Sequence, residues 1–338
     1  MKIKRIGVDL AKHVFQVHGV DEAGGVVVRK RLTRGQMLKF FVQVEPTLVG
    51  MEACGGAHYW ARELSKLGHT VKLIPPQYVK PYVKTNKNDA NDAAGICEAV
   101  SRPSMRFVPV KGVEQQALQS LHRVRERVVK SRTSLVNEVR GLLGECGLVL
   151  ALGVATVRHQ LPRLVEDAEN GLCMPMRALL HELYEELVVS DERLKHLDVQ
   201  VKQHAQSDAG ARRIQQLSGV GPVVASAVVS SIGDGRQFKN GREFAAWLGI
   251  VPRQHSSGGK DKLGGISKRG DSRLRTLLIH GARAVLKASA HKTDRRSQWL
   301  KSLVQRRNKN IATVALANKN ARIIWAMLAR EEDYRVAA

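Results

Sequence analysis

The segment Ile6-Gly7-Val8-Asp9-Leu10-Ala11-Lys12 sets the organisation of the N-terminal region. Residues 3–8 are predicted to form a strand that ends at Asp9, so this acid follows an apolar strand directly. Residues 13–20 alternate in polarity, and Val26-Val27-Val28 begins another apolar run after a Gly-rich turn. The start of the chain therefore predicts an antiparallel meander of three strands.

From residue 34 onward, predicted helices alternate with predicted strands. A meander followed by this alternation is the element order expected of an RNase H-like α/β domain, which we assign to residues 1–105. The expected elements are a helix around 34–43, a strand at 47–51 that delivers Glu52, a helix that ends at Gly68, a strand at 71–74 and a helix at 89–101.

Four acidic residues stand where such a fold would bring them together. Asp9 and Glu52 follow the first and fourth strands, and Asp89 and Asp92 share one face of the next helix. Carboxylates concentrated in a basic protein need a compensating cation, and Mg²⁺ (or Mn²⁺) prefers carboxylate oxygens while keeping sites free for phosphate. The alternative is that Asp89 and Asp92 only cap or stabilise a helix N-terminus.

The region 106–207 carries apolar heptad stripes on two predicted long helices. One interpretation is a helical hairpin that packs on itself. The other is a coiled-coil arm that joins two subunits while a basic face, with Arg123, Arg127 and Lys130, lies along nucleic acid. The stripes are Ala117, Leu121, Val124, Val128, Leu135 and Leu142, then Leu180, Leu183, Leu187, Leu194, Leu197 and Val201.

The third predicted domain, 208–338, is mainly helical. Gly219 and Gly221 join two predicted helices in a pattern typical of a helix-hairpin-helix, whose glycines let backbone N–H groups approach a phosphate. A plain tight turn between core helices is the alternative. Between residues 253 and 309 stand 16 Lys or Arg against three Asp, which indicates a phosphate-binding surface. Its candidate contacts are Arg253, Lys260, Lys268, Arg269, Arg273 and Arg275.

The whole chain is strongly basic, with 55 Lys and Arg against 31 Asp and Glu and a formal net charge of +24. Such an excess attracts polyanions, and nucleic acid is the usual partner. The sequence contains no run of about 18 or more apolar residues, so we predict no membrane-spanning helix. The basic N-terminus leads into a strand without a signal-peptide core, so we expect a bacterial cytoplasmic, nucleoid-associated protein. Four widely spaced cysteines predict neither a zinc site nor disulfides.

A polar loop within the basic region contains His255-Ser256-Ser257-Gly258-Gly259-Lys260. Paired glycines mark irregular backbone, and from this pattern alone a flexible turn is the commoner explanation. A nucleophilic serine would need a group that removes its proton and a group that stabilises its attack. Arg253, His255 and Lys260 are near in sequence, which does not make them near in space.

Motifs along nearly the whole chain resemble those of DEDD transposases. This insertion-sequence family includes the pilin-gene invertases and the bridge-RNA (seeker-RNA) guided recombinases. The acidic motifs are IGVDLAK at 6–12, MEA at 51–53 and NKNDANDA at 86–93. The C-terminal motifs are LSGVGP at 217–222, FAAWLGIVPR at 244–253, SGG at 257–259, ISKRGD at 266–271 and LR at 274–275.

The resemblance implies a RuvC-like nuclease fold with Asp9, Glu52, Asp89 and Asp92 as a metal-binding tetrad. It also implies that Ser257, the serine before the paired glycines, forms a covalent link to DNA. Ser256 stands where family members vary and ranks second. Target and donor DNA, a noncoding guide RNA that pairs with both, and a homo-oligomer, dimer or tetramer, are further implications of the resemblance.

Two functions of other classes remain open from the sequence. A Holliday-junction resolvase or other simple nuclease would use water as the nucleophile, and Ser257 would be part of a loop. A non-enzymatic nucleic-acid scaffold would use the acids only structurally. Rejoining of DNA ends distinguishes a recombinase from the first, and metal-dependent cleavage distinguishes an enzyme from the second.

Overall fold

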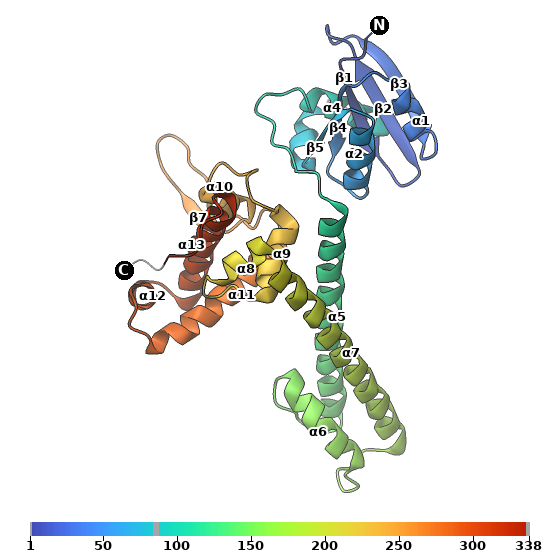
Figure 1. Ribbon diagram of the computed structural model, residues 1–338. Helices are drawn as coiled ribbons and strands as arrows, with labels where there is room; N and C mark the ends of the chain where they lie inside the picture. Colours follow the sequence, from blue (N-terminus) through green and yellow to red (C-terminus); the bar gives the residue numbers. More distant parts are fainter. Residues whose placement is uncertain (1, 84–87, 336–338) are drawn as a thin grey trace. The chain divides into compact units, whose positions relative to one another are not determined.

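The computed structural model describes residues 2–83 and 88–335. The chain divides into two compact units, Met1–Val113 and Glu114–Ala338, which are described separately here (Figure 1). The second unit contains both the long helices and the C-terminal helical region. The division into three domains at residues 105 and 207 therefore stays a prediction.

The first unit is built on a five-stranded sheet with the order β3-β2-β1-β4-β5. Strands β1, β2 and β3 are antiparallel neighbours, whereas β4 and β5 run parallel to β1. The predicted mixed α/β organisation of this region is confirmed. The elements are β1 (Arg5–Leu10), β2 (Val14–Val20), β3 (Val26–Thr33), α1 (Met37–Val42), β4 (Leu48–Glu52), α2 (Ala57–Lys66), β5 (Thr70–Ile74), α3 (Pro76–Val79), the 3-10 turn η1 (Lys80–Tyr82) and α4 (Asp89–Ala99).

The two faces of this sheet have different partners. On one face Ile6, Val8, Val49 and Met51 are fully buried in a core with Trp60 and other apolar residues of α1 and α2. On the opposite face, α4 packs against β1, β2 and β4. Alternate residues of β1 and β4 therefore face α4, and this face carries the candidate acids.

The second unit begins with two long antiparallel helices, α5 (Val113–Glu145) and α7 (Met174–Ser207), which Figure 1 shows side by side with α6 (Val154–Glu166) beside them. Leu180, Leu187 and Leu194 of α7 are buried against α5 within the same chain. The Arg132 guanidinium lies 2.7 Å from the Asp191 carboxylate across the pair. The structure thus agrees with the hairpin interpretation of the heptad stripes.

The predicted stripe is wrong by one residue at the start of α5. Ala117 is exposed, whereas Leu118 and His122 are buried. Nε2 of His122 is 2.9 Å from the Ser226 hydroxyl, so a polar contact with another helix sets which side of α5 is covered. Heptad spacing alone carries no information about such a contact.

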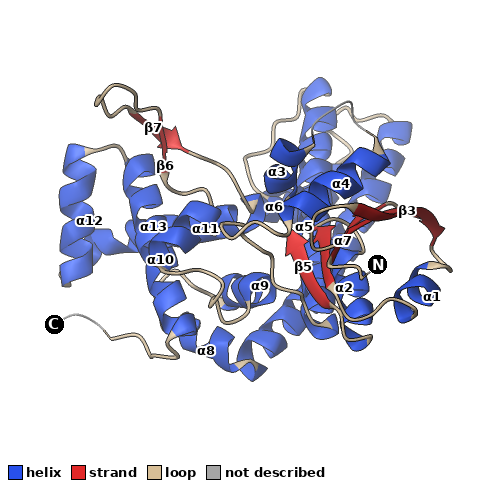
Figure 2. Ribbon diagram, turned by 90° about the horizontal axis from the view of Figure 1, so that it is seen from above, coloured by secondary structure: helices blue, strands red, loops and turns tan. Residues whose placement is uncertain are grey.

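The rest of the second unit is a helical body with one exposed hairpin (Figure 2). Its helices enclose a shared apolar core, while the short strands of the hairpin are exposed along almost their whole length. The mainly helical character predicted for this region is confirmed. The elements are α8 (Ala209–Gln215), α9 (Pro222–Ile232), α10 (Gly241–Trp247), β6 (Pro252–Gln254), β7 (Leu263–Ile266), α11 (Ser272–Ala288), the 3-10 turn η2 (Ser289–His291), α12 (Arg295–Arg306) and α13 (Lys309–Ala329).

Within residues 2–83 and 88–335, every helix is too short or too polar to cross a lipid bilayer.

Candidate active site

Two glycines allow α4 to lie close against the sheet. A Cβ atom at Gly7 would lie 2.2 Å from the carbonyl oxygen of Ala93, and one at Gly50 would lie 2.8 Å from a side-chain carbon at the end of α4. Asp9 and Glu52 each follow one of these glycines by two positions, so their side chains leave the same face of the sheet. The absence of side chains at the glycines therefore brings α4 to the two strand-end acids.

The start of α4 supplies the other two acids. The side-chain oxygen of Asn88 accepts a hydrogen bond from the backbone N–H of Asn91 at 2.8 Å, so Asn88 caps the helix. Asp89 and Asp92 lie in the first turn without acting as that cap. Of the third acidic motif, residues 86 and 87 lie outside the described residues. The N-cap alternative for the two aspartates is thus wrong, although the helix dipole still favours their charge.

The four carboxylates influence one another electrostatically. Burial, followed by the negative charges of Asp92, Asp89 and Glu52 in that order, raises the pKa of Asp9 from 3.8 to about 6. Burial, then the charges of Glu52 and Asp9, also raises the pKa of the Cys54 thiol. Because Coulombic interactions weaken with distance, the shift indicates that the predicted acids gather at one place.

The donor set of this cluster suits a hard divalent cation, since Mg²⁺ prefers carboxylate oxygens. Within the part of the chain that the structure describes, no three His, Cys, Asp or Glu side chains stand in an arrangement that could hold a metal ion. The mutual influence of the acids is compatible with this spacing, because the electrostatic interaction between carboxylates acts over longer distances than a metal–oxygen bond. The acids are gathered, and their side chains would have to turn inward to share one ion.

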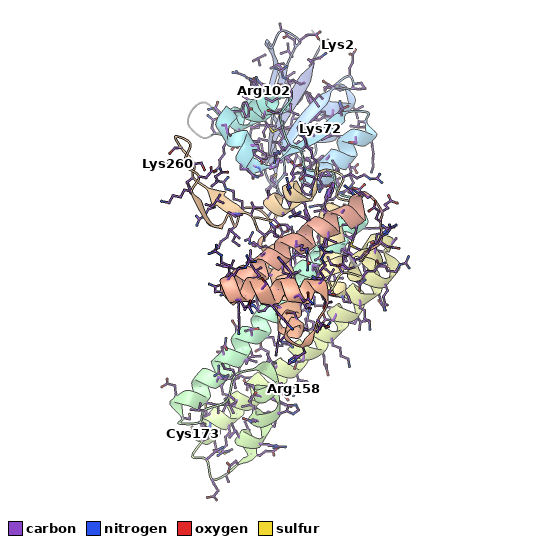
Figure 3. The ribbon with its side chains drawn as sticks, turned by 90° about the vertical axis from the view of Figure 1, so that its left-hand side faces the viewer. Lys2, Lys72, Arg102, Arg158, Cys173 and Lys260 are labelled. Carbon is purple, nitrogen blue, oxygen red and sulfur yellow. The ribbon has the colours of Figure 1, made fainter. Side chains whose placement is uncertain are left out.

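The candidate nucleophile lies in the second unit, at the turn of the β6–β7 hairpin. Ser257 and Lys260 form an antiparallel bridge, and the backbone N–H of Lys260 donates to the carbonyl of Ser257 at 3.1 Å. Between them, Gly258 and Gly259 have φ values of 55° and 73°. Two consecutive positive φ values are typical of a type I′ hairpin turn, which explains the paired glycines. Figure 3 shows Lys260 at the outer end of this hairpin.

The two adjacent serines have different surroundings. The hydroxyl of Ser256 donates to the Asp261 carboxylate at 2.8 Å and accepts from the Gln254 amide at 2.9 Å. The hydroxyl of Ser257 has no hydrogen-bond partner among the described residues. Ser256 therefore belongs to a polar cross-strand network, while Ser257 is an exposed residue outside that network.

Comparison with protein families bears on both units. The transposase model named for the DEDD group of IS110 matches residues 6–147, and the model described as "Transposase IS116/IS110/IS902 family" matches residues 211–298. A "Probable family 20 transposase" of Pseudomonas aeruginosa is 59% identical over 336 residues, 99% of each chain. The chain belongs to the IS110/IS116 transposase family.

Other relatives of this IS110/IS116 family member span similar lengths. The "Transposase for insertion sequence element IS1111A" of Coxiella burnetii is 50% identical over 99% of this chain and 92% of its own. The "Transposase for insertion sequence element IS1328" of Yersinia enterocolitica is 40% identical over 95% of this chain and 96% of its own. The matched regions therefore span both the segment that carries the acids and the hairpin that carries Ser257.

Most of the predicted nucleic-acid contacts of this IS110/IS116 chain are exposed. On the long helix α5, Lys130 pairs with Glu126 at 2.7 Å. The backbone N–H of Lys268 donates to Gly249 at 3.0 Å, which fixes the loop that carries it. These side chains are available at the surface of their own unit. The exposed candidates are Arg123, Arg127, Lys130, Arg253, Lys260, Lys268 and Arg269.

Two other predicted contacts face the interior of the second unit. Arg275 donates from Nη1 to the carbonyl of Leu248 at 3.0 Å, so it links α11 to the end of α10. Nη1 of Arg273 is buried without a hydrogen-bond partner among the described residues. Burial, followed by the charge of Arg273, lowers the pKa of His122 to about 4. Both arginines thus interact with neighbouring helices.

Gly219 has a packing reason that its sequence pattern did not reveal. Its φ is 90°, and a Cβ there would lie 2.9 Å from the carbonyl oxygen of Gly281 on α11. A Cβ at Gly281 would in turn lie 2.0 Å from the Gly219 carbonyl. Gly221, by contrast, has open space at its Cβ position. Packing therefore explains the glycine at position 219 but not the glycine at position 221.

Sequence reasoning missed the supporting residues of both sites. Gly7 and Gly50 each precede an acid by two positions, and this repeated spacing was a usable signal for close helix packing on that face. Asp261 carried no comparable signal, because its partner Ser256 is defined by the register of the hairpin.

Proposed function

We propose that this chain is an insertion-sequence transposase that cuts and rejoins DNA through a carboxylate tetrad and a serine nucleophile. The observation that carries the proposal is the gathering of Asp9, Glu52, Asp89 and Asp92 at one place, where burial and the charges of the other three acids raise the pKa of Asp9. Membership of the IS110/IS116 family, whose relatives are named as transposases of insertion sequences, supports the reaction class.

The tetrad is the proposed holder of Mg²⁺ (or Mn²⁺). When bound, the cation would polarise the scissile phosphate and promote loss of the serine proton. The carboxylates must be ionised to serve as ligands, and a bound cation offsets the mutual repulsion that raises the pKa of Asp9. The gathering of four acids in a chain of net charge +24 is consistent with this role.

Ser257 is the proposed nucleophile. Its Oγ attacks the scissile phosphorus, an Oγ–P bond forms, the bond to one deoxyribose oxygen breaks, and that oxygen leaves with a proton. The serine loses its own proton in the same exchange. In a later step, a deoxyribose hydroxyl attacks the phosphorus of the phosphoserine. A phosphodiester bond forms, the Oγ–P bond breaks, and Ser257 regains its hydroxyl. The covalent link conserves the energy of the phosphodiester, so rejoining needs no ATP.

The sheet supports assignment to the RNase H-like, RuvC-like class. An antiparallel β1–β2–β3 meander with β4 and β5 added parallel to β1 is the strand arrangement that the element order predicts. In the second unit, α8 and α9 flank the Gly219–Gly221 turn, and the open space at Gly221 supports a helix-hairpin-helix that contacts phosphate.

RNA guidance, oligomerisation and location are the further parts of the proposal. A noncoding bridge RNA would direct the choice of target and donor DNA, as the resemblance to bridge-RNA recombinases and pilin-gene invertases implies. The excess positive charge supports RNA binding and a nucleoid-associated location in the bacterial cytoplasm. A homo-oligomer would need a surface other than the buried heptad stripe, for example the exposed side of the α5–α7 coiled-coil arm. Sequencing of copurified nucleic acid and measurement of the mass of the assembly test these parts.

Substitution of Asp9 by Asn tests the tetrad. The variant should lose strand joining in Mg²⁺ while it keeps its fold and its binding of nucleic acid, because it loses a ligand charge and empties no core. Glu45→Gln is a matched control, since it removes one carboxylate that pairs with Lys2 at the surface of the same unit. Wild-type joining by Asp9→Asn with Mg²⁺ present would show that the tetrad assignment is wrong.

A simple nuclease is the second candidate function, and a cleavage assay separates it from a transposase. Such an enzyme would cut without rejoining and without a protein–DNA adduct. A non-enzymatic scaffold would bind nucleic acid with no metal-dependent change in the DNA.

A further inference from the structure

A polar surface continues from the carboxylates across the same face of the sheet. Residues directly opposite each other in antiparallel strands share a face, so the side chains of each row point to the side where α4 lies. Beyond β1, this face carries an amide, an imidazole and two exposed arginines. The two in-register rows are Asp9–Gln16–Arg31 and Gly7–His18–Arg29.

A small cavity lies between these strands and α4. Its volume is about 90 Å³, and its polar lining comes from Gln16, His18, Arg29 and Asn91. Asn91 stands between the two tetrad acids of α4 in the sequence. The cavity is small. That space suits a phosphate group better than a nucleobase.

The chemistry of the lining also suits an anion. Arg29 is exposed and supplies a permanent positive charge. His18 is only 8% exposed, and its ring has no hydrogen-bond partner among the described residues. Burial, followed by the charge of Arg29, lowers the pKa of His18, so at neutral pH its imidazole is neutral and has one N–H to donate. The amides of Gln16 and Asn91 add donors, and the described residues that line the cavity include no carboxylate.

We propose that this surface binds the sugar-phosphate backbone of the DNA strand whose scissile phosphate meets the carboxylates, with one phosphate held by Gln16, His18, Arg29 and Asn91. His18 lies one strand across and two residues along from Asp9, about 8 Å away by strand geometry. A phosphate held there is a near neighbour of the scissile phosphate in the same strand. The position of the scissile phosphate rests on the proposed function; the binding of the backbone does not require catalysis.

A pair of charge-matched variants tests the proposal. Lys30 lies next to Arg29 on β3 but on the opposite face, where its Nζ is 5.5 Å from the centre of the Phe40 ring. Arg29→Gln and Lys30→Gln remove the same charge from the same strand. Long-range attraction to DNA therefore falls equally, and any difference between them reports local contact.

Binding of a fluorescent single-stranded DNA oligonucleotide to the full-length protein, without divalent metal, is the measurement. Arg29→Gln should weaken binding roughly three- to tenfold and reduce the magnitude of the salt slope by about 0.7, the value for one phosphate contact on a single strand. Lys30→Gln should stay within about twofold of wild type with an unchanged slope. Equal affinities and slopes for the two variants would overturn the proposal.

A modified oligonucleotide and a second variant make the test sharper. Replacing phosphates one at a time by uncharged methylphosphonate should reveal one position that weakens binding of wild type but not of Arg29→Gln. His18→Gln, checked for its unfolding temperature, should weaken binding less than Arg29→Gln. If no position depends on Arg29, the phosphate site is wrong.

The outcome is separable from that of the tetrad test. Equal binding by Arg29→Gln and Lys30→Gln, together with inactive Asp9→Asn, would reject the phosphate site and leave the tetrad. A difference in binding together with active Asp9→Asn would reject the tetrad and leave the phosphate site.

Discussion

The carboxylate cluster and the serine hairpin show two ways in which this chain builds its proposed reactive groups. Asp9 lies half-buried on a central strand that glycines let α4 approach, and burial together with the charges of the neighbouring acids raises the pKa of Asp9 to about 6. Ser257 lies at an exposed type I′ turn, and its hydroxyl has no partner among the described residues. The first group obtains its chemistry from its surroundings within the fold. The second lies on an exposed turn and, as a nucleophile, would need its activating groups from elsewhere.

The difference has a physical reason. Acids that share a cation must be held together against their mutual repulsion, which requires a sheet, a helix and tight packing. The proposed nucleophile would have to reach a phosphate, and Ser257 lies on a two-stranded hairpin that is exposed along almost its whole length.

Removal of the Ser257 hydroxyl should have the largest effect. Ser257→Ala is expected to lower strand joining at least about a thousandfold, as for removal of other enzymatic nucleophiles, while RNA and DNA binding persist. Peptide mapping of trapped protein–DNA adducts should find the nucleotide on Ser257.

Ser256→Ala is the matched control for that variant, because it removes the neighbouring hydroxyl that is bonded to Asp261. It should reduce joining only several-fold. An adduct on Ser256 would move the nucleophile by one residue. Efficient cleavage by Ser257→Ala, with no adduct in wild type, would favour a nuclease that uses water.

A side chain at Gly7 should disrupt the carboxylate site next most strongly. Gly7→Ala places a Cβ atom 2.2 Å from a backbone oxygen of α4, so the helix must move away from the sheet. We expect a loss of about 3 kcal/mol in the free energy of unfolding, measured by urea denaturation, and loss of joining. Gly35→Ala has open space at the same atom and should change stability little. Similar stabilities for both variants would mean that close packing of α4 is not required.

Neutralising Asp9 should stabilise the metal-free protein. Folding raises the pKa of Asp9 from 3.8 to about 6, so the folded state loses stability as the pH rises through this window, and the full cost is present above it. Asp9→Asn removes that cost. After allowance for solvent screening of a half-exposed group, the gain is about 1 kcal/mol at pH 7.5.

Thermal unfolding at pH 7.5 and pH 4 checks this prediction. The advantage of Asp9→Asn should disappear at the lower pH, and Mg²⁺ should stabilise wild type more than the variant. A variant that is less stable than wild type at pH 7.5 without metal would contradict the charge coupling.

The smallest effect is expected for the exposed basic loop before α11. Arg269→Ala should weaken binding to all DNA sequences by a few-fold and reduce the magnitude of the salt slope by about 0.9, without a change in stability. Arg236→Ala removes an exposed charge that already pairs with Asp234 and Glu331, and it should leave the slope unchanged. A change in target choice with an unchanged slope for Arg269→Ala would count against a phosphate contact.

The sequence by itself determined the features of this protein that depend on the spacing of neighbouring residues. Apolar runs, turns and caps are properties of neighbouring residues, so the order of strands and helices in the first unit could be predicted to within a few positions. The same holds for the acids after β1 and β4 and for a turn at Gly258-Gly259. The family motifs added the tetrad and Ser257, which remain proposals.

Packing settled which partner each face meets, because partners come from distant parts of the chain. The leucines of α7 pack against α5 of the same chain, and the contact between His122 and Ser226 places His122 on the buried side of α5. Gly219 packs against Gly281, and Arg275 donates a hydrogen bond to the carbonyl of Leu248. Above all, Gly7 and Gly50 allowed α4 to reach the sheet, so that the acids of β1, β4 and α4 share one electrostatic environment. Periodicity predicts that a face exists, but the shape and charge of a remote element determine what covers it.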